Sequence, residues 1–333
     1  MKSPIDPARL RKIKLLGYLL GAILAAIVLT ISFTMVGIER RMDAMEFRQP
    51  GEGAPGRIIT VNGEPLHVRV QGDPLKDATG APLLLLHGFA RSGTEFGKIE
   101  AALAEQRSIL ILDRFGAGYS SRSTDSPDPY TPAGEARMIA ALLDQLGVPA
   151  VDIIGAAEGG AVALRLAVDA PARVRRLALI DARVDDPGPD FIGWLRGLIP
   201  FGARRILLWN DFAGGLSDQA ALERLCTDAS ACAAGLDPAW RAPGTVISGT
   251  TDALAAAIAA PHPALRADEL KALKAPIVIL WGERDGLLSA AYGQRLAATL
   301  PNAKFKPIAG AGHVPHLEQP AAVIEALKPF LAR

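Results

Sequence analysis

The sequence of 333 residues predicts an α/β fold: a mostly parallel, doubly wound sheet with an inserted helical lid, preceded by one N-terminal transmembrane helix. Three observations predict it. Short runs that are apolar almost throughout alternate with segments of helical period, and such runs are typical of strands buried on both faces of a parallel sheet. Residues 183–272 interrupt this alternation, and a long uncharged run stands near the N-terminus.

The uncharged run covers residues 15–38, and its 24 residues would span roughly 36 Å as a helix, which is enough to cross a bilayer. Basic residues outnumber acidic ones in residues 1–14, whereas the charges directly after the run are balanced. The positive-inside bias therefore predicts a cytoplasmic N-terminus and a body on the outer side, periplasmic or extracellular. A cleaved signal peptide is the rival interpretation, although its apolar core is usually about 7–15 residues long. Proline and glycine then indicate a linker over residues 39–57.

We expect the core of the body to consist of residues 58–182 and 273–333. It opens with two β-prone runs around Asn62-Gly63, a pair typical of hairpin turns, and a longer loop through Pro65 is the alternative. Thr131 and Pro132 suit the cap and first position of a helix over residues 133–146. The predicted strands are 83–86, 108–112, 151–154, 176–180, 276–281 and 303–308, and the other predicted helices are 95–104, 159–168, 289–299 and 320–331.

The inserted segment, residues 183–272, is predicted to be a mostly helical lid between two strands of the sheet. Its aromatic and leucine content favours a hydrophobic ligand, although the same side chains could serve to pack the lid on the body. The aromatic residues are Phe191, Trp194, Phe201, Trp209, Phe212 and Trp240.

The charge balance argues against a nucleic-acid partner, and the cysteines do not resemble a zinc site. There are 36 basic and 35 acidic residues, so the chain lacks the positive field that a nucleic-acid backbone requires. Cys226 and Cys232 have no neighbouring cluster of the kind that holds zinc, and both a short disulfide and two unpaired buried thiols remain open. We expect no metal and no organic cofactor, and the sequence leaves the oligomeric state open.

The turn after the strand 151–154 reads Gly155-Ala156-Ala157-Glu158-Gly159. A Gly-x-Ser-x-Gly turn raises its middle side chain above a sheet, because small neighbours let the backbone bend sharply from strand to helix. With this turn and the motifs below, the chain resembles the α/β-hydrolase family from about residue 58 to the C-terminus. The resemblance implies that Ala157 occupies the nucleophile position, where the family has serine.

Two further turns match the family. His87-Gly88-Phe89 follows the strand 83–86 and matches its His-Gly turn. The resemblance implies that the backbone N–H groups of Phe89 and Glu158 form an oxyanion hole, and that Gly88 and Phe89 contact the substrate. The segment 113–120 matches an Asp-x-x-Gly-x-Gly-x-Ser turn, for which we expect a structural role.

Asp285 and His313 complete the pattern. Asp285 follows the strand 276–281 in a Gly-x-x-Asp turn, and His313 follows the last strand. The resemblance implies that Asp285 orients His313, and that His313 takes the proton from a serine at position 157 before an acyl intermediate is released by water.

Other candidates for the chemistry are discounted. The Glu158 side chain is expected to point away from the substrate, and Ser92 lacks a base. His316 is a fallback base, whereas His262 and His67 are expected to be ordinary lid and surface residues.

The expected function is that of a membrane-anchored serine hydrolase acting on a carboxylic ester with a hydrophobic acyl or aryl group. With Ala157 at the nucleophile position, this chain should bind substrate without turning it over. Two origins for Ala157 remain open: a serine-to-alanine change made to trap a complex, or a natural non-catalytic relative that binds a small lipophilic ligand. The intact Asp285 and His313 favour the first.

Overall fold

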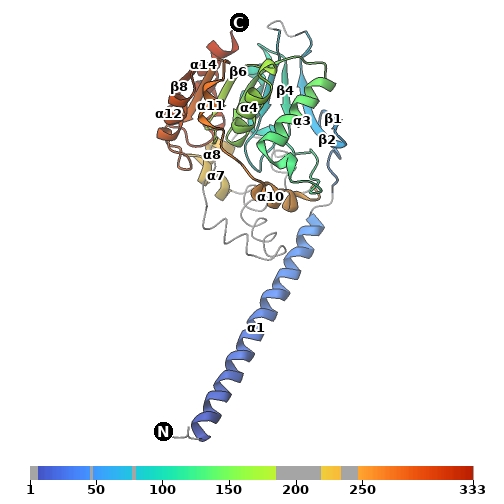
Figure 1. The fold of residues 1–333 in the computed structure, drawn as a ribbon, viewed down its shortest axis with the longest axis vertical. Helices are drawn as coiled ribbons and strands as arrows, with labels where there is room; N and C mark the ends of the chain where they lie inside the picture. The colour runs from blue at the N-terminus through green and yellow to red at the C-terminus, as the bar shows by residue number, and fades with distance from the viewer. Residues whose placement is uncertain (1–6, 46–47, 77–79, 185–218, 234–246, 333) are drawn as a thin grey trace.

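The computed structural model describes residues 7–45, 48–76, 80–184, 219–233 and 247–332. Its centre is an eight-stranded sheet with the order β1-β2-β4-β3-β5-β6-β7-β8 (Figure 1). β1 and β2 are antiparallel to their neighbours, and all later pairs are parallel, which confirms the predicted mostly parallel sheet. The strands are Arg57–Val61, Glu64–Gln71, Leu83–Leu86, Ile109–Leu112, Val151–Ala156, Val174–Ile180, Ile277–Gly282 and Ala303–Ile308, numbered β1 to β8 in this order.

The opening hairpin uses a two-residue turn. Asn62 and Gly63 both have positive φ, 53° and 88°, as a type I′ turn requires. Thr60 pairs with Pro65, so Pro65 belongs to β2 and the alternative of a longer loop is wrong.

Helices cover both faces of the sheet. In β3, Leu84 and Leu86 belong to a core cluster with α3, α4 and α12, whereas Leu83 and Leu85 belong to one with α2 and α14. Each strand residue thus packs on the face opposite to its neighbour's, which is why the strands are apolar throughout. These helices are α2 (Gly97–Ala104), α3 (Pro132–Gln145), α4 (Glu158–Asp169), α12 (Ala290–Thr299) and α14 (Pro320–Leu331), with short turns of helix at η1 (Gly93–Phe96), η2 (Asp128–Tyr130), η3 (Pro171–Arg173) and α13 (Pro315–Glu318).

The start of α3 follows the prediction in detail. Thr131 precedes the helix with extended backbone, and its hydroxyl accepts a hydrogen bond from Gly134 N at 3.0 Å. Pro132 occupies the first helical position, where its missing N–H leaves no bond unmade.

The N-terminal helix α1 (Pro7–Met45) extends away from the body in Figure 1. Its segment Lys14–Thr34 has a mean hydropathy of 2.3 and is not buried, so by length and composition it could cross a membrane; a signal sequence has the same properties. The helix ends at Met45, inside the range expected as linker. Arg48 then forms a β-bridge with Ile247, directly before α10, so the chain beyond the helix is tied to the inserted segment.

The inserted segment has four helices among its described residues: α7 (Gln219–Leu225), α8 (Ala229–Ala233), α10 (Thr250–Ala259) and α11 (Ala267–Lys271). Cys226 and Cys232 form a disulfide that links the ends of α7 and α8, which resolves the question that the sequence left open. The aromatic residues on which the hydrophobic lid was predicted lie in 185–218 and 234–246, outside the described residues.

Candidate active site

Ala157 stands at the sharp turn between β5 and α4. Its φ is 47° and its ψ is −119°, a conformation that an alanine adopts at a cost of about 1–3 kcal/mol. The backbone N–H of Ala157 donates to Ile180 O at 2.9 Å, which fixes the turn to the end of β6. The turn therefore keeps the shape of a nucleophile elbow although the side chain is a methyl group.

Glycines permit this turn. A Cβ added to Gly159 would lie 2.2 Å from Leu86 O, so only glycine lets α4 begin this close to β3. A Cβ added to Gly88 would lie 3.2 Å from the Ala157 methyl carbon, which shows that the His87-Gly88-Phe89 turn lies against the elbow.

His313 and Asp285 meet as predicted. His313 Nδ1 is 2.8 Å from Asp285 Oδ2, although 28 residues separate them in the chain. The other oxygen of Asp285 accepts hydrogen bonds from the N–H groups of Leu287 and Leu288 at 2.8 and 2.9 Å. Burial alone would raise the pKa of Asp285, but the hydrogen bond and charge of His313 outweigh it and lower the pKa. Asp285 is thus an ionised acceptor that holds the imidazole in one orientation.

The loop that carries His313 is also bonded to the inserted segment. His313 N donates to Leu225 O at 2.7 Å, at the end of α7 and next to the disulfide. Both Ala157 and His313 line the same cavity.

Asp181, at the end of β6, is a site residue that the sequence reasoning missed. Its Oδ1 accepts from Gly282 N at 3.0 Å, and its Oδ2 is buried with no hydrogen-bond partner among the described residues. Burial and the nearby charge of Asp285 raise the pKa of Asp181 well above the usual range, so the site favours the protonated form of this carboxyl group. Its only sequence signal was a carboxyl group at a strand end, which the strand order brings beside Asp285.

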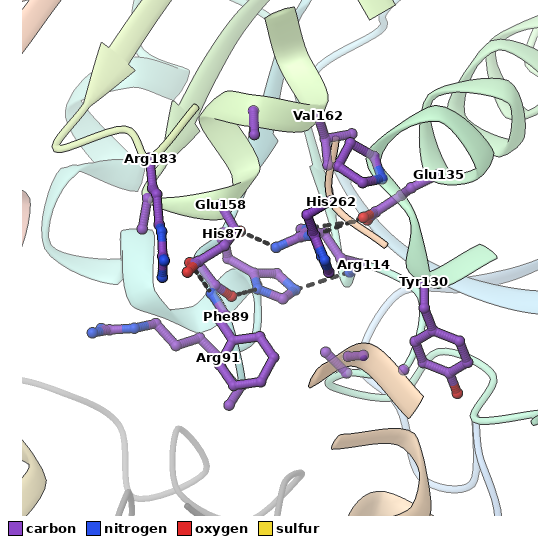
Figure 2. Close-up of a pocket in the computed structure, with 18 of the residues that line it drawn as sticks. His87, Phe89, Arg91, Arg114, Tyr130, Glu135, Glu158, Val162, Arg183 and His262 are labelled. Carbon is purple, nitrogen blue, oxygen red and sulfur yellow. Dashed lines mark hydrogen bonds and ion pairs between the residues drawn. The ribbon is translucent and has the colours of Figure 1, made fainter. Parts of the chain in front are cut away.

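The two N–H groups expected to form the oxyanion hole, those of Phe89 and Glu158, lie near the Glu158 carboxylate. Phe89 N donates to Glu158 Oε2 at 2.9 Å, and Glu158 lines the cavity (Figure 2). The expectation that this side chain points away from the substrate is therefore wrong. Burial opposes ionisation of Glu158, but the N–H groups of Phe89 and of Glu158 itself, with the Arg114 charge, outweigh it and lower its pKa. A carboxylate thus lies where both N–H groups can stabilise it.

The cavity in front of Ala157 has a volume of about 480 Å³. Part of its wall is apolar and comes from α10 and the following loop, with Leu254, Ile258 and Leu265. Arg114 also lines the cavity, and it donates two hydrogen bonds of 2.8 and 2.7 Å to Glu135. Figure 2 shows this pair on one side of Phe89 and Glu158, and Arg91 and Arg183 on the other. The cavity can hold a partly apolar ligand with a polar or anionic group.

The turn after β4 has the structural role expected for it. Asp113 accepts hydrogen bonds from Gly93 N at 2.7 Å and Tyr119 N at 2.9 Å, and so links the start of η1 to this turn. It also pairs with His67 Nδ1 at 2.7 Å, and His67 is only 3% exposed. The expectation that His67 is a surface residue is wrong. Burial would lower the pKa of His67, but the hydrogen bond and charge of Asp113 outweigh it and raise the pKa.

His316 and His262 are not placed as His313 is. His316 is 1% exposed, and burial lowers its pKa to about 3. It packs against Phe96 and is absent from the cavity lining, which argues against its role as a fallback base. His262 does line the cavity, and its Nδ1 contacts Ala260 O at 2.7 Å. The Ser92 hydroxyl forms a hydrogen bond with the hydroxyl of Thr94, which lies in η1.

Two groups of described side chains could offer ligand atoms to a metal ion. In the first, Asp181, Asp285 and His313, the nitrogen that faces the carboxyl groups is already bonded to Asp285. In the second, Cys226, Cys232 and Glu318, both sulfur atoms belong to the disulfide.

The eight-stranded sheet, the elbow and the His313–Asp285 pair together define the class of α/β hydrolases. A sequence model of the α/β hydrolase fold matches residues 81–320, and the chain belongs to this family. It is 27% identical over 293 residues to a 2-hydroxymuconate semialdehyde hydrolase of Pseudomonas putida, covering 83% of this chain and 94% of that one.

Solved structures agree on the fold. A thermophilic esterase of Thermogutta terrifontis superposes with a TM-score of 0.67 at 24% identity, covering 84% of this chain and 98% of the esterase. A membrane phospholipase A superposes with a TM-score of 0.64 at 22% identity, covering 96% of this chain and 98% of the phospholipase. A 2-hydroxymuconate semialdehyde hydrolase, an esterase and a phospholipase A are thus among the proteins that this chain resembles.

Proposed function

We propose that this chain has the site of a serine hydrolase for carboxylic esters, in a form whose nucleophile position holds Ala157 and which binds its substrate without forming an acyl intermediate. One observation carries the proposal: Ala157 has the strained backbone of an elbow and faces the same cavity as His313, which Asp285 orients. A site that had lost its chemistry altogether has no physical need for an oriented base.

With a serine at position 157, each residue would have a defined task. His313 would take the hydroxyl proton as the oxygen attacks the ester carbonyl, and Asp285 would stabilise the imidazolium that forms. The N–H groups of Phe89 and Glu158 would bind the developing oxyanion. His313 would then return the proton to the leaving alcohol, and water would release the acid in a second, equivalent step.

The substrate we propose is an ester with a hydrophobic acyl or aryl group, with Gly88 and Phe89 among its contacts. The apolar wall from α10 supports this, and similarity to an esterase is consistent with it. Cleavage of a carbon–carbon bond, as the name of the Pseudomonas putida relative suggests, is a less favoured reaction at the same site.

We further propose that α1 anchors the protein in a membrane, with residues 1–14 in the cytoplasm and the body on the outer side. The exposed apolar segment Lys14–Thr34 supports this. The membrane phospholipase A, which matches 96% of this chain, is consistent with it.

The test compares this chain with Ala157→Ser on short p-nitrophenyl esters. We expect hydrolysis above background from the serine form alone. No hydrolysis by either form would reject the ester hydrolase and favour the alternative function, a natural non-catalytic protein that binds a small lipophilic ligand. Ala157 itself is the observation that favours this alternative.

A further inference from the structure

The Glu158 carboxylate lies in the place that an oxyanion would take. It accepts the Phe89 N–H at 2.9 Å, and its own backbone N–H also stabilises it. Glu158 is the first residue of α4, so the positive end of the helix dipole favours the same charge. One donor of the proposed hole, the Phe89 N–H, is thus bonded to an anion that belongs to the chain and that starts from the residue carrying the second donor.

Two consequences follow from elementary electrostatics. A backbone N–H directed at a carboxylate is not available to a ligand oxygen, so the two acceptors compete for the same donors. A fixed negative charge also repels a second negative charge, and does so strongly in a partly desolvated site. While Glu158 stays in place, neither a carboxylate nor a developing oxyanion can use the hole.

The surroundings would suit an external anion once Glu158 has moved. Arg91 lines the cavity and its Nε pairs with Glu95 Oε2 at 3.3 Å, whereas its Nη1 is buried with no hydrogen-bond partner among the described residues and is the atom that a ligand anion could use. Arg183 also lines the cavity, and its backbone N–H donates to Ala157 O at 3.2 Å, which places it beside the elbow. Figure 2 shows both arginines on the same side of Phe89 and Glu158.

We propose that the oxyanion hole is a carboxylate-binding subsite that Glu158 fills in the ligand-free protein, and that a ligand carboxylate or acyl oxygen enters it by displacing Glu158. The inference uses the same cavity and donors as the proposed function. It does not require a nucleophile, and it applies to the chain as it stands, with Ala157. The ligand class it names is a small monocarboxylic acid with an apolar body, which is also the acid product of the proposed reaction.

The test measures binding of benzoate to the full chain by calorimetry. Glu158→Ala removes the competing anion, and we expect benzoate affinity to rise by about tenfold or more. Glu158→Gln keeps the side-chain size and loses the charge, so an intermediate increase is expected. Glu325→Gln, an exposed carboxyl group on α14, is the matched control and should leave the affinity unchanged.

Binding of neutral benzamide distinguishes the loss of electrostatic repulsion from the space that a substitution at Glu158 opens. Benzamide should gain much less than benzoate from Glu158→Gln, because that variant relieves repulsion of an anion only. Equal benzoate affinity in the parent chain and both Glu158 variants, all shown to be folded by circular dichroism, would overturn the proposal.

The same variants on the serine background separate this inference from the proposed function. If Ala157→Ser hydrolyses esters, adding Glu158→Ala should increase kcat/KM by about tenfold or more, because the two N–H donors become available. If no serine form reacts but benzoate binds more tightly to the Glu158 variants, the ester hydrolase is rejected and the carboxylate subsite stands. If the serine form reacts and Glu158→Ala changes neither rate nor affinity, the subsite is rejected alone.

Discussion

At the scale of residues, the site contains two neighbouring carboxyl groups whose pKa values are shifted in opposite directions. Asp285 is bonded to His313 and its pKa is lowered, whereas Asp181 is buried beside it and its pKa is raised. Neighbouring titratable groups whose pKa values are driven apart take different roles. We assign the orienting role to Asp285, and to Asp181 the support of Asp285 and of the β6–β7 edge.

Replacing each carboxyl group by its amide tests this assignment. On the Ala157→Ser background, Asp285→Asn should lower kcat for ester hydrolysis by roughly 10³–10⁴, because the amide cannot stabilise the imidazolium. Asp181→Asn should cost less than about tenfold, since a neutral amide resembles the neutral acid. Equal losses in the two variants would contradict the separate roles.

Asp181 also makes a prediction about stability and pH. Its folded-state pKa lies above the unfolded value of about 3.9, so between the two the native state keeps a proton that the unfolded state has lost. Stability contributed by this group is therefore present at low pH and falls by about 1.4 kcal/mol per pH unit across that window.

Asp181→Asn removes this titration and should stabilise the protein relative to the parent chain increasingly as pH rises from acid to neutral. Urea unfolding at several pH values measures it. A stability difference that is constant with pH would contradict the raised pKa.

At the scale of elements, the sequence was sufficient for most of the sheet. β3 has the predicted bounds, because an apolar run buried on both faces leaves little choice of conformation. β8 also has the predicted bounds, although it is a partly exposed strand at the edge of the sheet. The elbow was equally predictable, since its glycines are required by backbone contacts such as that of Gly159 with Leu86 O.

What the sequence could not predict depends on contacts between distant segments. The hydrogen bond between His67 and Asp113 joins positions 46 residues apart. Asp181 comes to lie beside Asp285 only because β6 pairs with β7. The direction of the Glu158 side chain depends on a rotamer and on the Phe89 N–H, neither of which a motif specifies.

The disulfide between α7 and α8 supports the site through one contact. Leu225, next to Cys226, accepts the His313 N–H at 2.7 Å. Replacing both cysteines by alanine should lower the free energy of unfolding by about 2 kcal/mol, the loop-entropy value for so short a loop. Urea unfolding of this variant measures it, and the parent chain under reducing conditions is the matched comparison. An unchanged midpoint would show that the bridge adds nothing to stability.

At the scale of the whole molecule, α1 is exposed and apolar, whereas the body has its own core on both faces of the sheet. This arrangement predicts that the full chain remains in the membrane pellet after an alkaline carbonate wash. A chain that begins at residue 48 should be released. Recovery of a mature protein that starts after α1 would instead identify a cleaved signal peptide, and would contradict the anchor.

In the function that we propose, positions 157, 285 and 313 form one reactive site. The most direct measurement is mass spectrometry of Ala157→Ser after treatment with a fluorophosphonate. We predict one adduct on the tryptic peptide 138–165, which contains position 157, and none on this peptide in the parent chain or when His313→Ala is added. An adduct elsewhere, or one that forms equally fast without His313, would contradict the account.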